Sequence, residues 1–219
     1  KFAPMVGDQH EDLEQYTDVI IRQTNDLRRI VDEFSKFARM PEPERRDHDL
    51  AKILNDAVVL QRNGQPGVRI LANIPVGPVP AEIDATMISQ ALTNLIKNAG
   101  EAIETRQEKR VELPFVPEIR VVLTSDGGQS VIAISDNGIG LPADRARLFE
   151  PYVTTRAHGT GLGLPIVKKI IEEHGGSFEL LDAEPFDAAS SHTGARAEIR
   201  LSTGLAAISS FGGKLAGTG

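Results

Sequence analysis

Apolar residues near the start of the chain recur every seven positions. One series is formed by Leu13, Ile20, Leu27 and Phe34, and a second seam, four residues on, by Thr17, Thr24, Val31 and Ala38. Strict seven-residue spacing is typical of helices that pack in a supercoiled bundle or hairpin. We therefore predict one long amphipathic helix over residues 11–39, which either packs against a partner helix or lies on the chain's own globular domain. It should end at Met40, because prolines follow at positions 41 and 43.

After a charged segment, predicted to be a linker over residues 41–48, the hydrophobic pattern alternates between helical and strand periods. Asp126-Gly127-Gly128 lies between two strand patterns and is a strong hairpin signal. This alternation predicts a compact domain over residues 49–202. The expected helices cover 49–61, 84–104 and 165–174, and the expected strands cover 68–74, 118–125, 130–136, 177–182 and 195–201. The Gly-, Ser- and Ala-rich tail over 203–219 is expected to be poorly ordered.

Composition narrows the possible functions. The net charge of −7 argues against nonspecific binding of nucleic acid, which depends on basic patches. The absence of cysteine excludes disulfides and thiolate metal sites, and agrees with a reducing compartment. No apolar run is long enough to span a membrane, and no signal-peptide pattern opens the sequence.

Three segments, which follow one another in a fixed order along the chain, carry the candidate chemistry. The first is Asn94-Leu-Ile-Lys-Asn98, in which the two amides lie four residues apart and therefore share one side of a helix. Buried amides need polar partners, and a phosphate-bound Mg²⁺ is one such partner. The alternative is that the pair caps neighbouring backbone.

The second segment, Asp136-Asn-Gly138-Ile-Gly140, ends a predicted strand in a tight turn. A carboxylate at the mouth of a sheet can accept a hydrogen bond from an exocyclic amine such as adenine N6. Gly138 and Gly140 would let the backbone approach the base. The alternative is a plain hairpin turn, since Asp-Asn-Gly is common turn chemistry.

The third segment, Gly159-Thr160-Gly161-Leu162-Gly163-Leu164, comes just before a predicted helix. Amide groups at a helix start form an anion site, so we expect a triphosphate at this point of the chain; a flexible glycine-rich loop is the alternative. Between the second and third segments, Phe149 and Tyr152 are candidates to anchor a lid. Arg156 is either a phosphate ligand or a solvated loop charge.

Together these segments resemble the N, G1, F and G2 boxes of sensor histidine kinases. Residues 161–176 are especially similar to this family, and Gly194-Ala-Arg-Ala matches its last glycine box in part. Residues 32–41 are similar to the dimerisation helix of nitrogen-regulation kinases of the NtrY type. The resemblance covers residues 13–201. It implies an α+β fold: a two-layer α/β sandwich of the Bergerat (GHKL) type, with a mixed sheet covered by helices on one face and one long dimerisation helix before it.

The resemblance also implies roles. Asp136 would hold adenine, Asn98 would bind Mg²⁺, and Asn94 would contact phosphates or metal-bound water. In gyrase-like ATPases the position of Asn94 is usually a glutamate that activates water. Asparagine is a poor base, so its presence favours phosphoryl transfer over hydrolysis. The catalytic residues implied are Asn94, Asn98 and Arg156, and the nucleotide-binding residues are Asn94, Asn98, Asp136, Gly138, Gly140, Thr160, Gly161, Leu162, Gly163 and Leu164.

One departure from the family pattern concerns the phosphate-accepting histidine, which sits in a His-Glu-x-x-Asn-Pro box that is absent from this sequence. His10-Glu11 has only the first pair, and the other histidines, His48, His158, His174 and His192, are expected to be structural or solvated. The acceptor is thus expected on an upstream helix outside the chain, so that this fragment would not phosphorylate itself.

By resemblance, the full protein would be a homodimer, with this part in the cytoplasm and an anchor in the inner membrane. Its partner would be an NtrX-like response regulator. Two other classes stay open. One is a gyrase-, Hsp90- or MutL-like ATPase clamp, and the other is a nucleotide-binding or dimer module without turnover.

Overall fold

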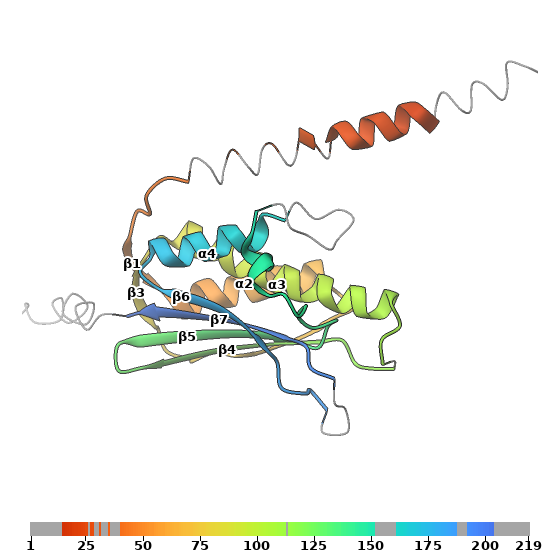
Figure 1. Ribbon diagram of the computed structural model, residues 1–219. Coiled ribbons are helices and arrows are strands. Elements are labelled where there is room, and N and C mark those ends of the chain that lie inside the picture. The colour runs from red at the N-terminus through yellow and green to blue at the C-terminus, as the bar shows by residue number, and fades with distance from the viewer. Residues whose placement is uncertain are drawn as a thin grey trace, which may run out of the picture.

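The computed structural model describes residues 15–25, 27, 28, 31, 35, 40–112, 114–151, 161–187 and 192–203. The described residues of the N-terminal segment up to Ser35 are helical, as the seven-residue pattern predicts. In Figure 1 this red helix extends away from the domain. Ile20 is 64% exposed and Leu27 62% exposed. Hence the described part of the helix does not lie on the chain's own domain, which was one of the two alternatives.

The domain contains one five-stranded mixed sheet. Its strand order is β2 (Arg69–Asn73), β4 (Glu118–Asp126), β5 (Gln129–Asp136), β7 (Ala195–Ser202) and β6 (Ser177–Asp182). β2 runs parallel to β4, and every other neighbouring pair is antiparallel. Strand β5 therefore has a hydrogen-bonded strand on both sides, which places its C-terminal residue, Asp136, in the interior of the sheet.

Three helices, α2 (Leu50–Gly64), α3 (Ala85–Glu108) and α4 (Gly163–Glu173), cover one face of the sheet (Figure 1). Aspartates begin the first two. Asp49 accepts a hydrogen bond from the amide of Ala51, and Asp84 accepts from the amides of Thr86 and Met87. Such side-chain caps satisfy amides that have no partner in the first turn of a helix. The two-layer α+β sandwich predicted from the sequence is confirmed.

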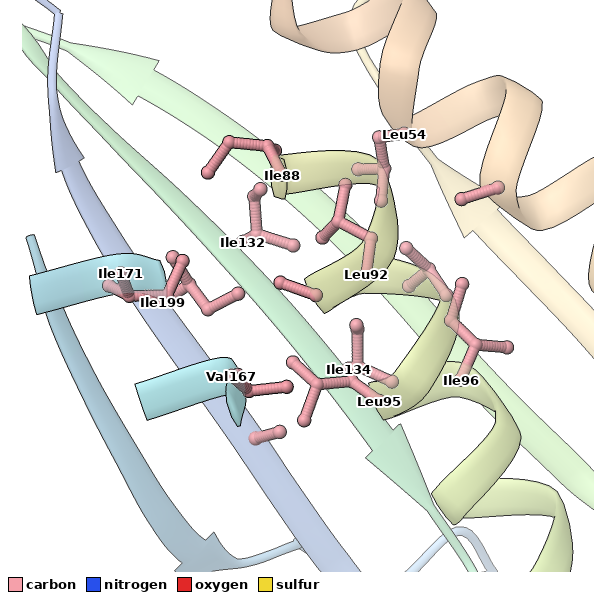
Figure 2. Close-up of a cluster of buried hydrophobic side chains, with 14 of the residues drawn as sticks. Leu54, Ile88, Leu92, Leu95, Ile96, Ile132, Ile134, Val167, Ile171 and Ile199 are labelled. Atoms are coloured by element: carbon pink, nitrogen blue, oxygen red, sulfur yellow. The ribbon is translucent and has the colours of Figure 1, made fainter. Parts of the chain in front are cut away.

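The core lies between the sheet and the helices. Alternate residues of a strand point to one face, and on β5 these are Ile132 and Ile134. Figure 2 shows them packed against Leu92 and Leu95 of α3. Val167 and Ile171 of α4 extend the same cluster toward Ile199 of β7. The apolar stripe of α3 therefore fixes which of its faces is left for the polar residues Asn94 and Asn98.

Two short strands differ from the sequence expectation. Residues 46–48, expected in the charged linker, and Asp49, expected to begin the first helix, form β1 (Arg46–Asp49), which pairs antiparallel with β3 (Pro80–Ile83). Strand pairing uses backbone groups, so the charged and partly exposed side chains of β1 gave no alternating pattern to recognise. The pairing attaches the segment before α2 directly to the segment before α3.

The remaining element is a short 3-10 helix, η1 (Ala146–Phe149). The edge of the Phe149 ring meets the Phe178 ring of β6, with centroids 5.7 Å apart. Phe149 thus packs on β6, and its predicted role as the anchor of a lid stays a prediction, because residues 152–160 lie outside the described residues. Among the helices in the described ranges, none is both long enough and apolar enough to cross a membrane.

Candidate functional site

The carboxylate of Asp136 lies at the end of the central strand β5. The residue is only 5% exposed. Its Oδ1 accepts hydrogen bonds from the amides of Gly138 at 2.8 Å and Ala195 at 3.5 Å. Burial raises the pKa of Asp136 to about 7, although these two hydrogen bonds act in the opposite direction. A buried carboxyl group whose pKa is near neutral, at the mouth of a sheet, is a strong candidate to bind a polar ligand group.

The turn after Asp136 is wedged between α3 and the segment that enters β7. A Cβ atom on Gly138 would lie 2.5 Å from the backbone carbon of Ala102, and one on Gly140 would lie 2.9 Å from the carbonyl oxygen of Thr193. Gly140 also has a φ of +82°, which favours glycine. These two glycines therefore let the turn pack closely against the backbone of other segments of the protein. Their predicted approach to a base stays a prediction.

Helix α3 brings the turn and the third segment together. Asn94, Asn98 and Ala102 are spaced four residues apart, so they form one stripe along the helix. The carbonyl of Ala102 accepts a hydrogen bond from the amide of Ile139 at 3.0 Å. One turn earlier, the side chain of Asn98 lies beside Gly163, whose Cβ position is 3.7 Å from Asn98 Nδ2. The helix thus links the carboxylate turn to the start of α4, and both Asn94 and Asn98 are partly buried on it.

The N-terminus of α4 differs from those of α2 and α3. Its N-cap residue is Leu162, whose side chain makes no capping hydrogen bond. Leu162 is fully buried, so it anchors the loop while Gly163 and Leu164 stay partly accessible. Gly161, with a φ of +69°, sets the direction of entry. A helix start of this kind, which adjoins the side-chain amide of Asn98, can bind an anion.

Two residues predicted for the site, Arg156 and Thr160, lie outside the described residues. The same is true of Tyr152 and Gly159, which belonged to the predicted lid and phosphate loop. Of the predicted site residues, those on α3, those in the turn after β5 and those at the start of α4 lie on adjoining elements. Within the described ranges, no group of three histidine, cysteine or acidic side chains is arranged to hold a metal. A magnesium site at this place would use the amide oxygen of Asn98 together with phosphates and water, which suits that ion.

Sequence reasoning missed two buried residues that hold the turn. The side chain of Asn137 accepts from the amide of Glu118 at 3.0 Å and donates to the carbonyl of Val116 at 2.7 Å. Arg106, 3% exposed, donates from Nη1 to the carbonyl of Asn137 at 2.7 Å and stacks on the ring of Phe115. Arg106 continues the stripe of Asn94, Asn98 and Ala102 by one further turn, and that spacing was the available signal.

Two of the histidines hold backbone groups, in agreement with the expectation that they are structural. His174 Nδ1 donates to the carbonyl of Ile170 at 2.7 Å, and its Nε2 accepts from the amide of Asp84 at 3.0 Å. His192 Nε2 lies 2.7 Å from the carbonyl oxygen of Gly138. His10 and His158 lie outside the described residues.

Residues 83–205 match the family described as histidine kinase-, DNA gyrase B- and HSP90-like ATPases. The chain is 50% identical to the nitrogen regulation protein NtrY of Azorhizobium caulinodans over 84% of its own length and 23% of that protein's length. It is 32% identical to the sensory histidine kinase/phosphatase NtrB of Rhodobacter capsulatus, over 76% of the chain and 48% of that protein. The chain therefore spans less than half of these relatives.

Solved structures agree on the fold. The catalytic domain of the histidine kinase ThkA superposes with a TM-score of 0.60 at 23% identity, covering 73% of the chain and 96% of that domain. Full-length ShkA in complex with AMPPNP gives a TM-score of 0.63 at 23% identity, covering 87% of the chain and 39% of ShkA.

Proposed function

The chain belongs to the family of histidine kinase-, DNA gyrase B- and HSP90-like ATPases, and from this premise we propose that it is the ATP-binding catalytic part of a nitrogen-regulation sensor histidine kinase. The reaction is transfer of the γ-phosphoryl group of ATP to a histidine on an upstream helix, for relay to a response regulator. The 50% identity to an NtrY protein supports the subtype.

The observation that carries the proposal is the stripe on α3. Ala102 supports the turn of Asp136, and Asn98 adjoins the uncapped start of α4. One rigid helix thus sets the spacing between an adenine-binding carboxylate and a phosphate-binding helix end. Four residues of helix span about 6 Å, so Asn98 and Asn94 lie about 6 and 12 Å along α3 from Ala102. In the proposal the phosphates of the nucleotide follow this line from the turn of Asp136 to the start of α4.

Each described residue then has a defined task. Asp136 accepts a hydrogen bond from the exocyclic amine of adenine. The amides at the start of α4 hold phosphate oxygens, and Asn98 presents its amide oxygen to Mg²⁺, which neutralises phosphate charge when it is bound. Asn94 orients phosphate or metal-bound water. Arg156 and Thr160 are proposed as further phosphate contacts.

Transfer breaks the bond between the γ-phosphorus and the bridging oxygen, which leaves with ADP. A P–N bond forms to a neutral imidazole nitrogen of the acceptor. Asn94 has no ionisable group and is a poor general base, so the site positions reactants and does not activate water. This favours transfer to histidine over hydrolysis.

The organisation of the whole protein is proposed on the same grounds. We propose residues 1–40 as the second helix of the dimerisation hairpin, 41–45 as the linker before β1 and 49–202 as the catalytic domain. The tail predicted over 203–219 lies, except for residue 203, outside the described residues. The apolar residues exposed on the N-terminal helix, among them Ile20 and Leu27, support pairing with a partner helix in a homodimer. An NtrX-like response regulator, a cytoplasmic location for this part and a membrane anchor elsewhere complete the proposal.

The test is incubation of the chain with γ-labelled ATP, Mg²⁺ and a separate polypeptide that carries the upstream histidine helix. Acid-labile label on that polypeptide is the expected result. Release of label only as free phosphate would indicate an ATPase clamp. Nucleotide binding without either reaction would leave a binding module.

A further inference from the structure

The carbonyl groups of the two residues that follow Asp136 are each held by a side chain from a distant segment of the chain. Arg106 of α3 donates to the carbonyl of Asn137 at 2.7 Å. His192, in the segment before β7, places Nε2 2.7 Å from the carbonyl oxygen of Gly138. We infer that His192 is a positioning residue, which helps to fix the carboxylate of Asp136 for nucleotide binding by holding the carbonyl of Gly138. This inference rests on the proposed function of the same site.

The partners of His192 determine how its ring is arranged. A carbonyl oxygen only accepts hydrogen bonds, so Nε2 carries the proton and donates. Nδ1 then faces the carboxylate of Glu112, with 3.9 Å between Nδ1 and Oε2. The His192 side chain is 11% exposed, so little room is left for the ring to turn away.

Glu112 is itself held by Arg106. Its carbonyl accepts a hydrogen bond from Arg106 Nη2 at 3.2 Å, and its φ of +47° is unusual for a residue with a side chain. Arg106 therefore fixes both Asn137 and the residue that faces His192. Hydrogen bonds thus join Arg106 to Asn137 and Glu112, and His192 to Gly138, while the Glu112 carboxylate lies 3.9 Å from His192 Nδ1, beyond hydrogen-bond distance.

Gly138 transmits this restraint to Asp136. The amide of Gly138 donates to Asp136 Oδ1 at 2.8 Å, while its carbonyl is held by His192. The peptide group between Gly138 and Ile139 is held at both ends, by His192 at the carbonyl and by Ala102 at the Ile139 amide. Loss of the His192 contact would leave only the second of these restraints, and rotation about the bonds of Gly138 would then weaken the hydrogen bond from its amide to Asp136. His192 touches neither adenine nor phosphate in this scheme and acts only through Gly138.

The test compares three substitutions at position 192. His192→Gln keeps an N–H donor at a reach similar to that of Nε2, His192→Asn has a shorter side chain, and His192→Leu has no donor. Affinity is measured by titration with a fluorescent trinitrophenyl-ATP analogue and by its displacement with ATP. Thermal unfolding without nucleotide is measured in parallel. His48→Leu, on the partly buried strand β1, is the matched control.

The expected result is ATP affinity within about twofold of wild type for His192→Gln and roughly three- to tenfold weaker for His192→Leu, the size of one hydrogen bond. The unfolding temperature of His192→Leu should resemble that of His48→Leu. Unchanged affinity in His192→Leu, or equal loss in the Gln and Leu variants, would overturn the inference. If His192→Leu does not fold, the other two variants decide. Weaker ATP binding by His192→Gln would overturn the inference, whereas wild-type affinity in His192→Gln with weaker binding in His192→Asn would support it. Failure of the wild type to bind ATP would instead refute the proposed function.

Discussion

Asp136 and Gly194 lie in direct backbone contact at the ends of neighbouring strands. A Cβ atom built on Gly194 would overlap the carbonyl oxygen of Asp136. The next residue, Ala195, donates its amide toward the carboxylate of the same aspartate. Gly194 therefore lets β7 approach β5 closely enough to complete the environment of Asp136.

The first prediction is that Gly194→Ala weakens nucleotide binding and lowers stability together. Relief of the overlap requires the two strand ends to separate, which costs about 1–3 kcal/mol in a packed region. Urea unfolding and ATP titration measure the two effects. Gly67→Ala is the control, because a Cβ atom there meets nothing within 4 Å. Equal behaviour of the two variants would contradict the close contact.

The second prediction concerns the metal. Asn98→Ala should reduce the gain in ATP affinity that Mg²⁺ provides in wild type, because Asn98 is the proposed protein ligand. Isothermal titration with and without Mg²⁺ measures this gain. Asn55→Ala on α2 is the control, since Asn55 donates to the carbonyl of Ala51 within its own helix. If Mg²⁺ helps Asn98→Ala as much as wild type, Asn98 does not bind the metal.

Local features of the site could be predicted from the sequence. The turn at Asp136 is encoded by adjacent residues, and the pairing of Asn94 with Asn98 on one face follows from helical geometry alone. The starts predicted for two helices, at residues 49 and 84, fall on the observed N-caps Asp49 and Asp84, since a capping side chain binds amides only two or three residues away.

Contacts between distant segments could not be predicted in the same way. The spacing of Arg106 places it on the stripe of Asn98 and Ala102, but only the fold shows that it is buried and donates to the carbonyl of Val111. His192 lies in a polar segment whose position relative to Gly138 depends on the pairing of β5 with β7. The pairing of β1 with β3 was missed for a similar reason, since its hydrogen bonds are backbone groups without a sequence signature.

The third prediction concerns the junction between the linker and the domain. The carboxylate of Asp84 accepts hydrogen bonds from the amides of Thr86, Met87 and, across the linker, Glu44 at 3.1 Å. Asp84→Ala should lower the free energy of unfolding by about 1–2 kcal/mol, the usual cost of losing an N-cap. It should also speed hydrogen exchange at Glu44. Asp56→Ala, at an exposed position within α2, should leave both unchanged.

The pH dependence of this effect follows from the pKa of Asp84. Burial alone would raise the pKa, but the hydrogen bonds from Met87, Glu44 and Thr86, together with nearby His174, outweigh it and lower the pKa. A lowered carboxyl pKa contributes stability that is present above the unfolded value of about 3.9 and is lost as the pH falls below it. The difference in stability between wild type and Asp84→Ala should therefore be larger at pH 7 than at pH 2. A difference as large at pH 2 as at pH 7 would contradict the assignment.

The fourth prediction separates function from stability at Asp136. Burial raises the pKa of this carboxyl to about 7, so the folded domain holds the protonated form better than the unfolded chain does. This stabilisation is fully present below the unfolded pKa and is lost as the pH rises to 7. Asp136→Asn has no charge to bury. It should be more stable than wild type at pH 8, by up to about 4 kcal/mol for three pKa units, and the advantage should shrink toward pH 5.

Nucleotide binding should change in the opposite direction. The ionised carboxylate is the proposed acceptor for the adenine amine. The side-chain NH₂ of an asparagine is itself a donor and cannot accept a hydrogen bond from that amine, so ATP affinity should fall at least about tenfold. In wild type, affinity should decline as the pH drops below 7, because binding then requires loss of a proton, whereas Asp136→Asn should lack this dependence. Titration from pH 6 to 8, with the exposed Asp126→Asn as control, measures both. If Asp136→Asn binds ATP normally, or is less stable than wild type at pH 8, Asp136 is a structural residue of the turn. A residue that is present for its ligand is expected to lower the stability of the folded domain at the pH where that ligand binds best, and a structural residue is not.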